Sequence, residues 1–389
     1  MNLQVKPDTL LLYGELVART GLNMSLVGVD LAQNMKLGST DGLWLQTLIT
    51  AHEETTARMS DSIDRGFRAM TGSGTELKRT ATYYQATDQK SAADLDSTYP
   101  ASARPAIDTP TPGIVDVPGK AGPYEANAGT DVEDPSQHTK PPGQPQEFTD
   151  PLKFFNVVSD FMSPSWWMNQ VLNDTIGCNP LEFVVDKLVG DWEGFARCAV
   201  VWEHMSKATG AIGENVKCGL TWLAADWQGQ AADAAVHYFD YTRQALDSHR
   251  DVLHHLHEKY LDVARGVWNA ARSLADLLKS ILDNVIVAGV AVLAAWWLSW
   301  TGVGAGISLA VAALECANIW RLWDAVTGRV SDTQTLIEGF VGFIQSQEAH
   351  VLNDVEPTAM PATDYDHPAV APESTIPTDD NGRCIEPPA

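Results

Sequence analysis

The fold is decided by the stretch Asp226-Trp227-Gln228-Gly229-Gln230-Ala231-Ala232, which lies between two long helical patterns. Gly229 can adopt backbone angles that a side chain forbids. Trp227 supplies a large apolar surface that would hold the turn against a neighbouring helix. We therefore predict a tight break between two helices at this Trp-x-Gly sequence.

The residues that follow Gly229 have the pattern of a helix packed along another helix. Mostly apolar or small residues recur at alternating steps of four and three without interruption, which is the a/d pattern of helix–helix packing. We call these positions the seam: Ala235, Phe239, Thr242, Leu246, His249, Leu253, Leu256, Tyr260, Val263, Val267, Ala270, Leu274, Leu277 and Ile281. Because no strand-like alternation of useful length occurs, the sequence predicts an all-α fold.

Composition limits the classes of function. The 389 residues suffice for two or three domains, and 44% are hydrophobic. The formal net charge of −24 repels nucleic acid and anionic lipid headgroups, so nucleic acid is not an expected partner. The five cysteines include no Cys-x-x-Cys pair, which argues against a zinc ribbon or a thioredoxin-like motif.

Four regions are expected along the chain. Residues 1–98 read as an antiparallel helical hairpin, with Pro7 and Asp8 at a helix start and a turn at 38–42. Its second helix is expected from Leu43 to about Asp94, loosened near Gly72-Ser73-Gly74. Residues 99–148 form a proline-rich linker, expected to be a disordered tether, and residues 149–353 form a helical domain. Residues 354–389 are proline-rich and acidic, and are expected to be disordered.

An apolar segment lies inside the second domain. Residues 284–314 contain no charged side chain, but Ser299-Trp300-Thr301-Gly302 and the glycines after it interrupt the segment. Each half is then shorter than the roughly 20 residues that a membrane-spanning helix needs. Two interpretations remain open: a helical hairpin buried under amphipathic helices, and a segment that contacts a membrane.

No catalytic constellation, cofactor motif or metal site stands out. His249, His254, His255 and His257 are the best metal candidates, but a solvated helix face explains them as well. Gly302-x-Gly304-x-Gly306 follows an apolar helix pattern and not a strand, so it does not indicate a phosphate loop. We therefore expect neither catalytic residues nor a cofactor nor a metal; an enzyme with an unrecognised site remains an alternative.

The motifs resemble a known group of exported proteins. Trp227-x-Gly229 followed by Ala231-Ala232-x-Ala234 resembles the WxG-motif helical hairpins exported by the type VII (ESX) secretion systems of actinobacteria. Gly190-Asp191-Trp192-Glu193 upstream resembles the larger version of that domain. The resemblance covers roughly residues 151–351. It implies a helical hairpin flanked by extra helices and an apolar segment.

The first hairpin resembles the small ESX secretion-associated helical proteins. In that family a Tyr-x-x-x-Asp/Glu step after the hairpin acts as an export signal, and Tyr84 and Asp88 match it. The chain departs from the family in one respect, since its Trp-x-Gly turn and its Tyr-x-x-x-Asp step lie in different predicted domains. Export should depend on Tyr84 and Asp88, and Tyr84→Ala should leave the protein folded.

Together the resemblances imply a non-enzymatic secretion substrate or export-associated protein that acts through helix–helix binding. Its expected partners are a WxG-type helical protein or the secretion machinery, and both homo- and hetero-oligomers remain open. No signal peptide is visible at the start of the chain, so the expected location is secreted or cell envelope, cytoplasmic before export. The alternative function is a membrane-active protein that inserts residues 284–314. Trp227 and Gly229 should be structural first; the rival view is that they face solvent as a recognition mark.

Overall fold

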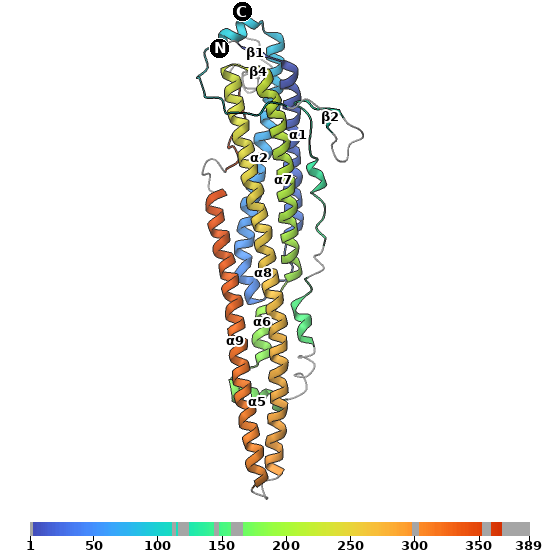
Figure 1. Ribbon diagram of the computed structural model, residues 1–389, viewed down its shortest axis with the longest axis vertical. Coiled ribbons are helices and arrows are strands. Elements are labelled where there is room, and N and C mark those ends of the chain that lie inside the picture. The colour runs from blue at the N-terminus through green and yellow to red at the C-terminus, as the bar shows by residue number, and fades with distance from the viewer. Residues whose placement is uncertain are drawn as a thin grey trace, which may run out of the picture.

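The chain folds into a long helical rod (Figure 1). The computed structural model describes residues 3–110, 114–115, 124–143, 148–156, 166–297, 303–351 and 359–367. The fold is all-α, as predicted. Two short antiparallel pairs accompany the helices: β1 (Gln4–Val5) with β4 (Trp227–Gln228), and β2 (Ile114–Val115) with β3 (Tyr124–Glu125).

The first two long helices are α1 (Pro7–Asn34) and α2 (Leu43–Ala86), which run antiparallel. They approach closely where glycines face each other: a Cβ added at Gly74 would lie 2.7 Å from the Gly14 carbonyl oxygen and 2.5 Å from the Ala18 nitrogen. Here the expected loosening near Gly72–Gly74 is wrong. The helix continues because at Gly74 the missing side chain makes room for α1.

The second helix nevertheless ends earlier than Asp94. A break at Thr87 and Asp88 separates α2 from the short helix α3 (Gln89–Asp96). The Asp88 carboxylate accepts hydrogen bonds from the backbone amides of Lys90 and Ser91 and so caps α3. The capping residue explains why the chain starts a new helix here.

The Trp-x-Gly turn joins α7 (Trp192–Asp226) to α8 (Gln230–Trp297), as the sequence predicted. The seam on α8 is buried at every predicted position except Leu277, which is partly buried while its neighbour Leu278 is fully buried. The two helices run antiparallel, since Ser206 on α7 donates to the Arg250 carbonyl and His257 contacts the Ala199 carbonyl.

Both hairpins share one core, which corrects the expected division into two tethered domains. His52 on α2 hydrogen bonds to the Tyr260 hydroxyl on α8 at 2.8 Å, and Ser62 bonds to His249 at 2.7 Å. Tyr13 on α1 packs edge-to-face on Phe239 with ring centroids 5.1 Å apart. The apolar face that a lone hairpin leaves uncovered is therefore buried against α7 and α8. The upper half of the rod is a bundle of α1, α2, α7 and α8 (Figure 1).

The lower half is built around α8 and α9 (Val303–Val351), which are antiparallel, with α5 (Trp166–Ile176) and α6 (Pro180–Leu188) beside them (Figure 1). Phe340 on α9 packs edge-to-face on Tyr260 at 5.0 Å. Asn179 caps α6 and Asp191 caps α7, because each side chain accepts a hydrogen bond from a backbone amide in the first turn of its helix. The 3-10 helices are η1 (Pro135–Gln137) and η2 (Pro151–Phe155).

The proline-rich region 99–148 is in part packed on the bundle, which corrects the expectation of a disordered tether. Asn215 on α7 accepts the backbone amides of Val132 and Glu133 through its side-chain oxygen. Arg19 on α1 forms an ion pair with Asp131 at 2.9 Å. These polar contacts hold an extended segment that has little apolar surface of its own to bury.

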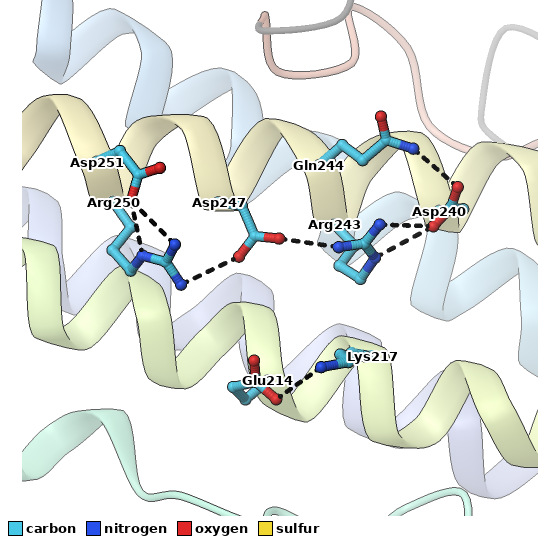
Figure 2. Close-up of polar contacts among 8 residues, drawn as sticks. All are labelled: Glu214, Lys217, Asp240, Arg243, Gln244, Asp247, Arg250 and Asp251. Atoms are coloured by element: carbon cyan, nitrogen blue, oxygen red, sulfur yellow. Dashed lines mark hydrogen bonds and ion pairs between the residues drawn. The ribbon is translucent and has the colours of Figure 1, made fainter. Parts of the chain in front are cut away.

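The outer face of α7 and α8 carries charged side chains in a ladder (Figure 2). Arg243 bonds to Asp240 and Asp247, and Arg250 bonds to Asp247 and Asp251. Apart from Arg250 and Asp251, which are adjacent in the chain, these pairs are three or four residues apart, a spacing that supports a helix exposed on this side.

Candidate functional site

The two predicted motifs meet at the upper end of the rod, although they lie in different hairpins. The Tyr84 ring contacts the Trp227 ring edge-to-face, with centroids 6.0 Å apart and an interplanar angle of 73°. Trp227 is fully buried and Tyr84 is 8% exposed. We call these two residues the Tyr84–Trp227 pair. Its formation brings together the two motif halves that are separated in the sequence.

The turn itself has the geometry that its residues predicted. Gly229 has a φ of +139°, a conformation that residues with a side chain rarely adopt. A Cβ added there would lie 2.7 Å from an Asp96 carboxylate oxygen. The burial of Trp227 agrees with the structural interpretation of this residue and not with a solvent-facing mark.

Two distant segments close the turn from outside. The Asp96 carboxylate at the end of α3 accepts the amides of Gln230 at 2.9 Å and Ala231 at 3.0 Å, and thereby caps α8. On the other side, Val5 pairs with Trp227 in the β1–β4 ladder. The start of α8 is thus fixed by the first hairpin.

Arg104, from the proline-rich region, lies over the same turn. Its guanidinium donates to the Trp227 carbonyl oxygen at 2.6 Å and forms an ion pair with Asp233 at 2.8 Å. The Trp227 carbonyl follows the last turn of α7, where backbone acceptors lack helical partners.

Asp88 lies apart from this buried cluster. Its carboxylate is exposed and holds the first turn of α3; hydrogen bonds from Ser91 lower the pKa of this carboxyl. Asp88 is therefore ionised at neutral pH and open to solvent. Of the two predicted signal residues, Tyr84 is in the core and Asp88 is on the surface.

A segment near the C-terminus covers the pair. Residues 359–367, within the region expected to be disordered, lie against α2 and α8. The His367 ring stacks on the Trp227 indole, with centroids 6.1 Å apart and an angle of 22°, and its Nε2 lies 3.3 Å from the Tyr84 hydroxyl. Burial raises the pKa of Tyr84 and lowers the pKa of His367 to about 4. Both groups are thus neutral at neutral pH. The rest of the predicted tail, 354–358 and 368–389, lies outside the described residues.

Sequence reasoning missed Asp96, Arg104, Tyr365 and His367 at this site. One signal was available: Met360, Tyr365 and His367 are bulky residues in a tail otherwise rich in small and acidic ones. The contacts themselves join segments more than a hundred residues apart, so no local pattern reveals them.

Three of the four candidate histidines are neighbours on α8: the His254 ring stacks on His257, with centroids 6.0 Å apart, and lies 6.5 Å from His255, whereas His249 is buried in the core. His249 contacts Ala245 and Ser62, and His257 contacts Ala199. Within the part of the chain that the structure describes, no group of three or more His, Cys, Asp or Glu side chains is arranged to hold a metal ion.

At the opposite end of the rod, the apolar segment is mostly exposed. Among its described residues, the exposed fraction of the side chain is 73% for Trp296 and 53–62% for Val290, Val292, Leu293, Leu309 and Leu314. Only one side, including Val285 and Ala288, is buried. A cavity of about 480 Å³ lies beside it, lined by Trp167, Val171 and α8. The interpretation of this segment as a buried hairpin is therefore wrong for the described residues.

Within the described residues one helix, over Gln230–Trp296, contains a stretch long and apolar enough to cross a membrane by length and composition. No family model, no curated protein and no solved structure matches this chain.

Proposed function

We propose that this chain is a non-enzymatic substrate of a type VII (ESX) secretion system, recognised at the end of the rod that carries the Tyr84–Trp227 pair. The observation that carries the proposal is the contact between the two rings at 6.0 Å. The resemblance of Tyr84-x-x-x-Asp88 and Trp227-x-Gly229 to two halves of an export motif supports it, because one aromatic ring from each half meets the other in the folded chain.

In this proposal the buried pair gives the site its shape, and Asp88 is the exposed group that a partner contacts. The partner is a WxG-type helical protein or a component of the secretion machinery. The chain is then cytoplasmic before export, and secreted or located in the cell envelope afterwards.

The burial of Tyr84 changes how the proposal must be tested. Tyr84→Ala was expected to leave the fold intact, but the ring is 8% exposed and packs on Trp227, so truncation would leave a cavity. Asp88→Asn is the sharper variant. Asparagine caps a helix about as well as aspartate, so the substitution removes the charge and keeps α3.

The test compares secretion of Asp88→Asn with that of Asp94→Asn, an exposed carboxylate on the same short helix. We expect Asp88→Asn to fold normally and to stay in the cell, whereas Asp94→Asn reaches the medium as wild type does. Normal secretion of a folded Asp88→Asn protein would contradict the proposal.

A second candidate function follows from the exposed apolar tip, which favours insertion into a lipid surface. Helix α8 contains a stretch long and apolar enough to cross a membrane, but its uncharged part from Asn284 to Trp297 rises only roughly 20 Å, less than the ~30 Å hydrocarbon core. In this candidate function the tip therefore enters the bilayer without crossing it. Because the net charge of −24 opposes anionic headgroups, the expected surface is a neutral one.

Flotation with phosphatidylcholine vesicles tests this candidate. Val290→Glu with Leu293→Glu should abolish binding, while Leu22→Glu with Leu26→Glu, two exposed leucines on α1, should not. If neither the wild type nor the control variant floats with vesicles, the tip does not insert. Loss of a dimer in the Val290→Glu, Leu293→Glu protein would then assign the tip to self-association.

A further inference from the structure

Residues 359–367, which we call the strap, lie between α2 and α8, and we call the space that they fill the groove. Backbone atoms of the strap bond to side chains of both helices. The Tyr365 amide donates to the Ser73 hydroxyl at 2.8 Å, and the His367 amide donates to the Glu76 carboxylate at 3.2 Å. From the other side, the hydroxyls of Tyr238 and Tyr241 donate to the carbonyls of Thr363 and Ala359, both at 2.9 Å.

Two side chains of the strap anchor it. Tyr365 is 6% exposed and packs against Tyr238 and Phe239, with ring centroids 6.0 and 5.9 Å away. His367, at the far end, covers the Trp227 ring and contacts Tyr84. The second anchor therefore lies directly on the Tyr84–Trp227 pair.

The absence of a side chain at Gly72 on α2 leaves room for Asp364 of the strap. A Cβ added to Gly72 would lie 2.8 Å from the Cβ and 2.3 Å from a carboxylate oxygen of Asp364, and its three nearest atoms all belong to Asp364. Glycine costs roughly 1 kcal/mol relative to alanine inside a helix. Helix α2 accepts that cost where the strap passes.

The strap is also easier to release than the elements beneath it. It has no helical or strand hydrogen bonding of its own, and the bonds that fix it to α2 and α8 run through side chains. Segments of this kind open at a free energy well below that of global unfolding. The Tyr84–Trp227 contact joins α2 to the α7–α8 turn and does not pass through the strap.

We propose that the strap is an autoinhibitory peptide, and that the groove between α2 and α8 is the peptide site from which it must leave before the Tyr84–Trp227 pair is recognised. The regulatory part of this proposal rests on the proposed export function. The other part, that an extended peptide with tyrosine and histidine anchors occupies the groove, does not depend on the export function.

The first experiment measures occupancy alone, in the full-length protein. Tyr365→Ser with His367→Ser removes both anchors and leaves the groove intact. A synthetic peptide of residues 359–367 should then bind with one-to-one stoichiometry in isothermal titration calorimetry. The wild type should bind the peptide about tenfold more weakly, because its tethered strap competes at an effective concentration near millimolar. Binding to both proteins alike, or to neither, would overturn the proposal.

A second variant releases the strap from the opposite side. The three atoms nearest to a Cβ added at Gly72 all belong to Asp364, so Gly72→Leu should expel the strap and also reject the added peptide. Gly328→Leu on α9, where an added Cβ meets nothing within 4 Å, is the matched control and should behave as wild type. Hydrogen exchange at the Tyr365 and His367 amides reports the release directly.

The third measurement is the export rate. If the strap is docked about ten times as often as it is open, its permanent release raises recognition about tenfold. Both releasing variants should therefore be exported faster than wild type. Unchanged or slower export of these variants, with Asp88→Asn still retained, would overturn the regulatory role and leave the proposed function standing. If Asp88→Asn is exported normally, the proposed function fails while the peptide-binding result still decides the occupancy of the groove.

Discussion

Among single residues, Trp227 is one of the largest fully buried side chains, together with Trp44 and Trp202. It is fully buried and contacts Tyr84, Val5 and His367 from three different segments. We expect Trp227→Ala to lower the free energy of unfolding by roughly 3–5 kcal/mol, the usual cost of removing a core tryptophan.

Urea denaturation followed by circular dichroism measures this change. The control is Trp320→Ala on α9, where the side chain is 55% exposed and the loss should be much smaller. Equal losses in the two variants would contradict the assignment of Trp227 to the core.

The buried histidine His249 makes a second prediction, which concerns pH. The Ala245 carbonyl can only accept, so Nδ1 donates to it and Nε2 accepts from the Ser62 hydroxyl. Burial lowers the pKa of His249 from its ordinary value of 6.5. The folded state thus favours the neutral ring. Its contribution to stability is complete above about pH 6.5 and is lost as the pH falls below that value.

His249→Gln isolates this contribution, because glutamine offers a donor and an acceptor but does not titrate. Burial also raises the pKa values of Glu76 and Asp30, which acts in the opposite direction at acid pH, so the comparison must be between variants. Between pH 7.5 and 5.5 the wild type should lose more unfolding free energy than His249→Gln. An equal loss would show that His249 is not the titrating group.

At the scale of helices, the contact between α1 and α2 depends on close backbone approach. Gly74 faces the Gly14 carbonyl and Ala18 on α1, and an added Cβ would be only 2.5–2.8 Å from them. Gly74→Val should separate the helices and lower the melting temperature, although glycine disfavours helices in isolation. Gly339→Ala on α9, where an added Cβ meets nothing within 4 Å, should leave stability unchanged or raise it by up to about 1 kcal/mol. If Gly74→Val is as stable as wild type, the close packing inferred here is wrong.

The elements also show which features the sequence can reveal. The seam of α8 was predictable residue by residue, because burial on a helix repeats every three to four positions. The Trp-x-Gly turn and the caps at Asn179 and Asp191 are also local features, because each depends on residues next to it in the chain. The continuity of α2 was not predictable: Gly72 and Gly74 look like a weak point until the strap and α1 occupy the space beside them.

The candidate site was predictable only in its parts. Tyr84, Asp88, Trp227 and Gly229 could be chosen from motifs, but their meeting depends on how two hairpins pack. The cap supplied by Asp96 comes from the end of helix α3, whereas the cover supplied by Arg104 and His367 comes from segments whose composition resembles that of disordered chains. Such segments become ordered through polar contacts with an existing surface, and those contacts leave no periodic pattern.

At the scale of the whole molecule, the shared core predicts cooperative unfolding. His52 and Ser62 on α2 are bonded to Tyr260 and His249 on α8, so neither hairpin keeps its buried polar groups satisfied alone. Helical circular dichroism and tryptophan fluorescence should therefore give coincident unfolding transitions in urea.

A fragment of residues 1–98 supplies the complementary measurement. It should show less helix than the same residues in the intact protein, because the face of the first hairpin that meets α7 and α8 would be exposed to water. Two well-separated transitions, or a stably folded fragment, would restore the two-domain interpretation.

The order of the chain sets a delay during synthesis between the appearance of the Tyr84–Trp227 pair and that of the strap that covers it. Tyr84 and His367 are 283 residues apart, so a ribosome adding about 5–20 residues per second needs roughly 15–60 s to travel from one to the other. The α7–α8 turn emerges within that interval, well before the strap. A growing chain therefore has its two aromatic rings uncovered for seconds, and only the finished polypeptide can cover them. An empty groove therefore marks a chain whose synthesis has not yet reached the strap.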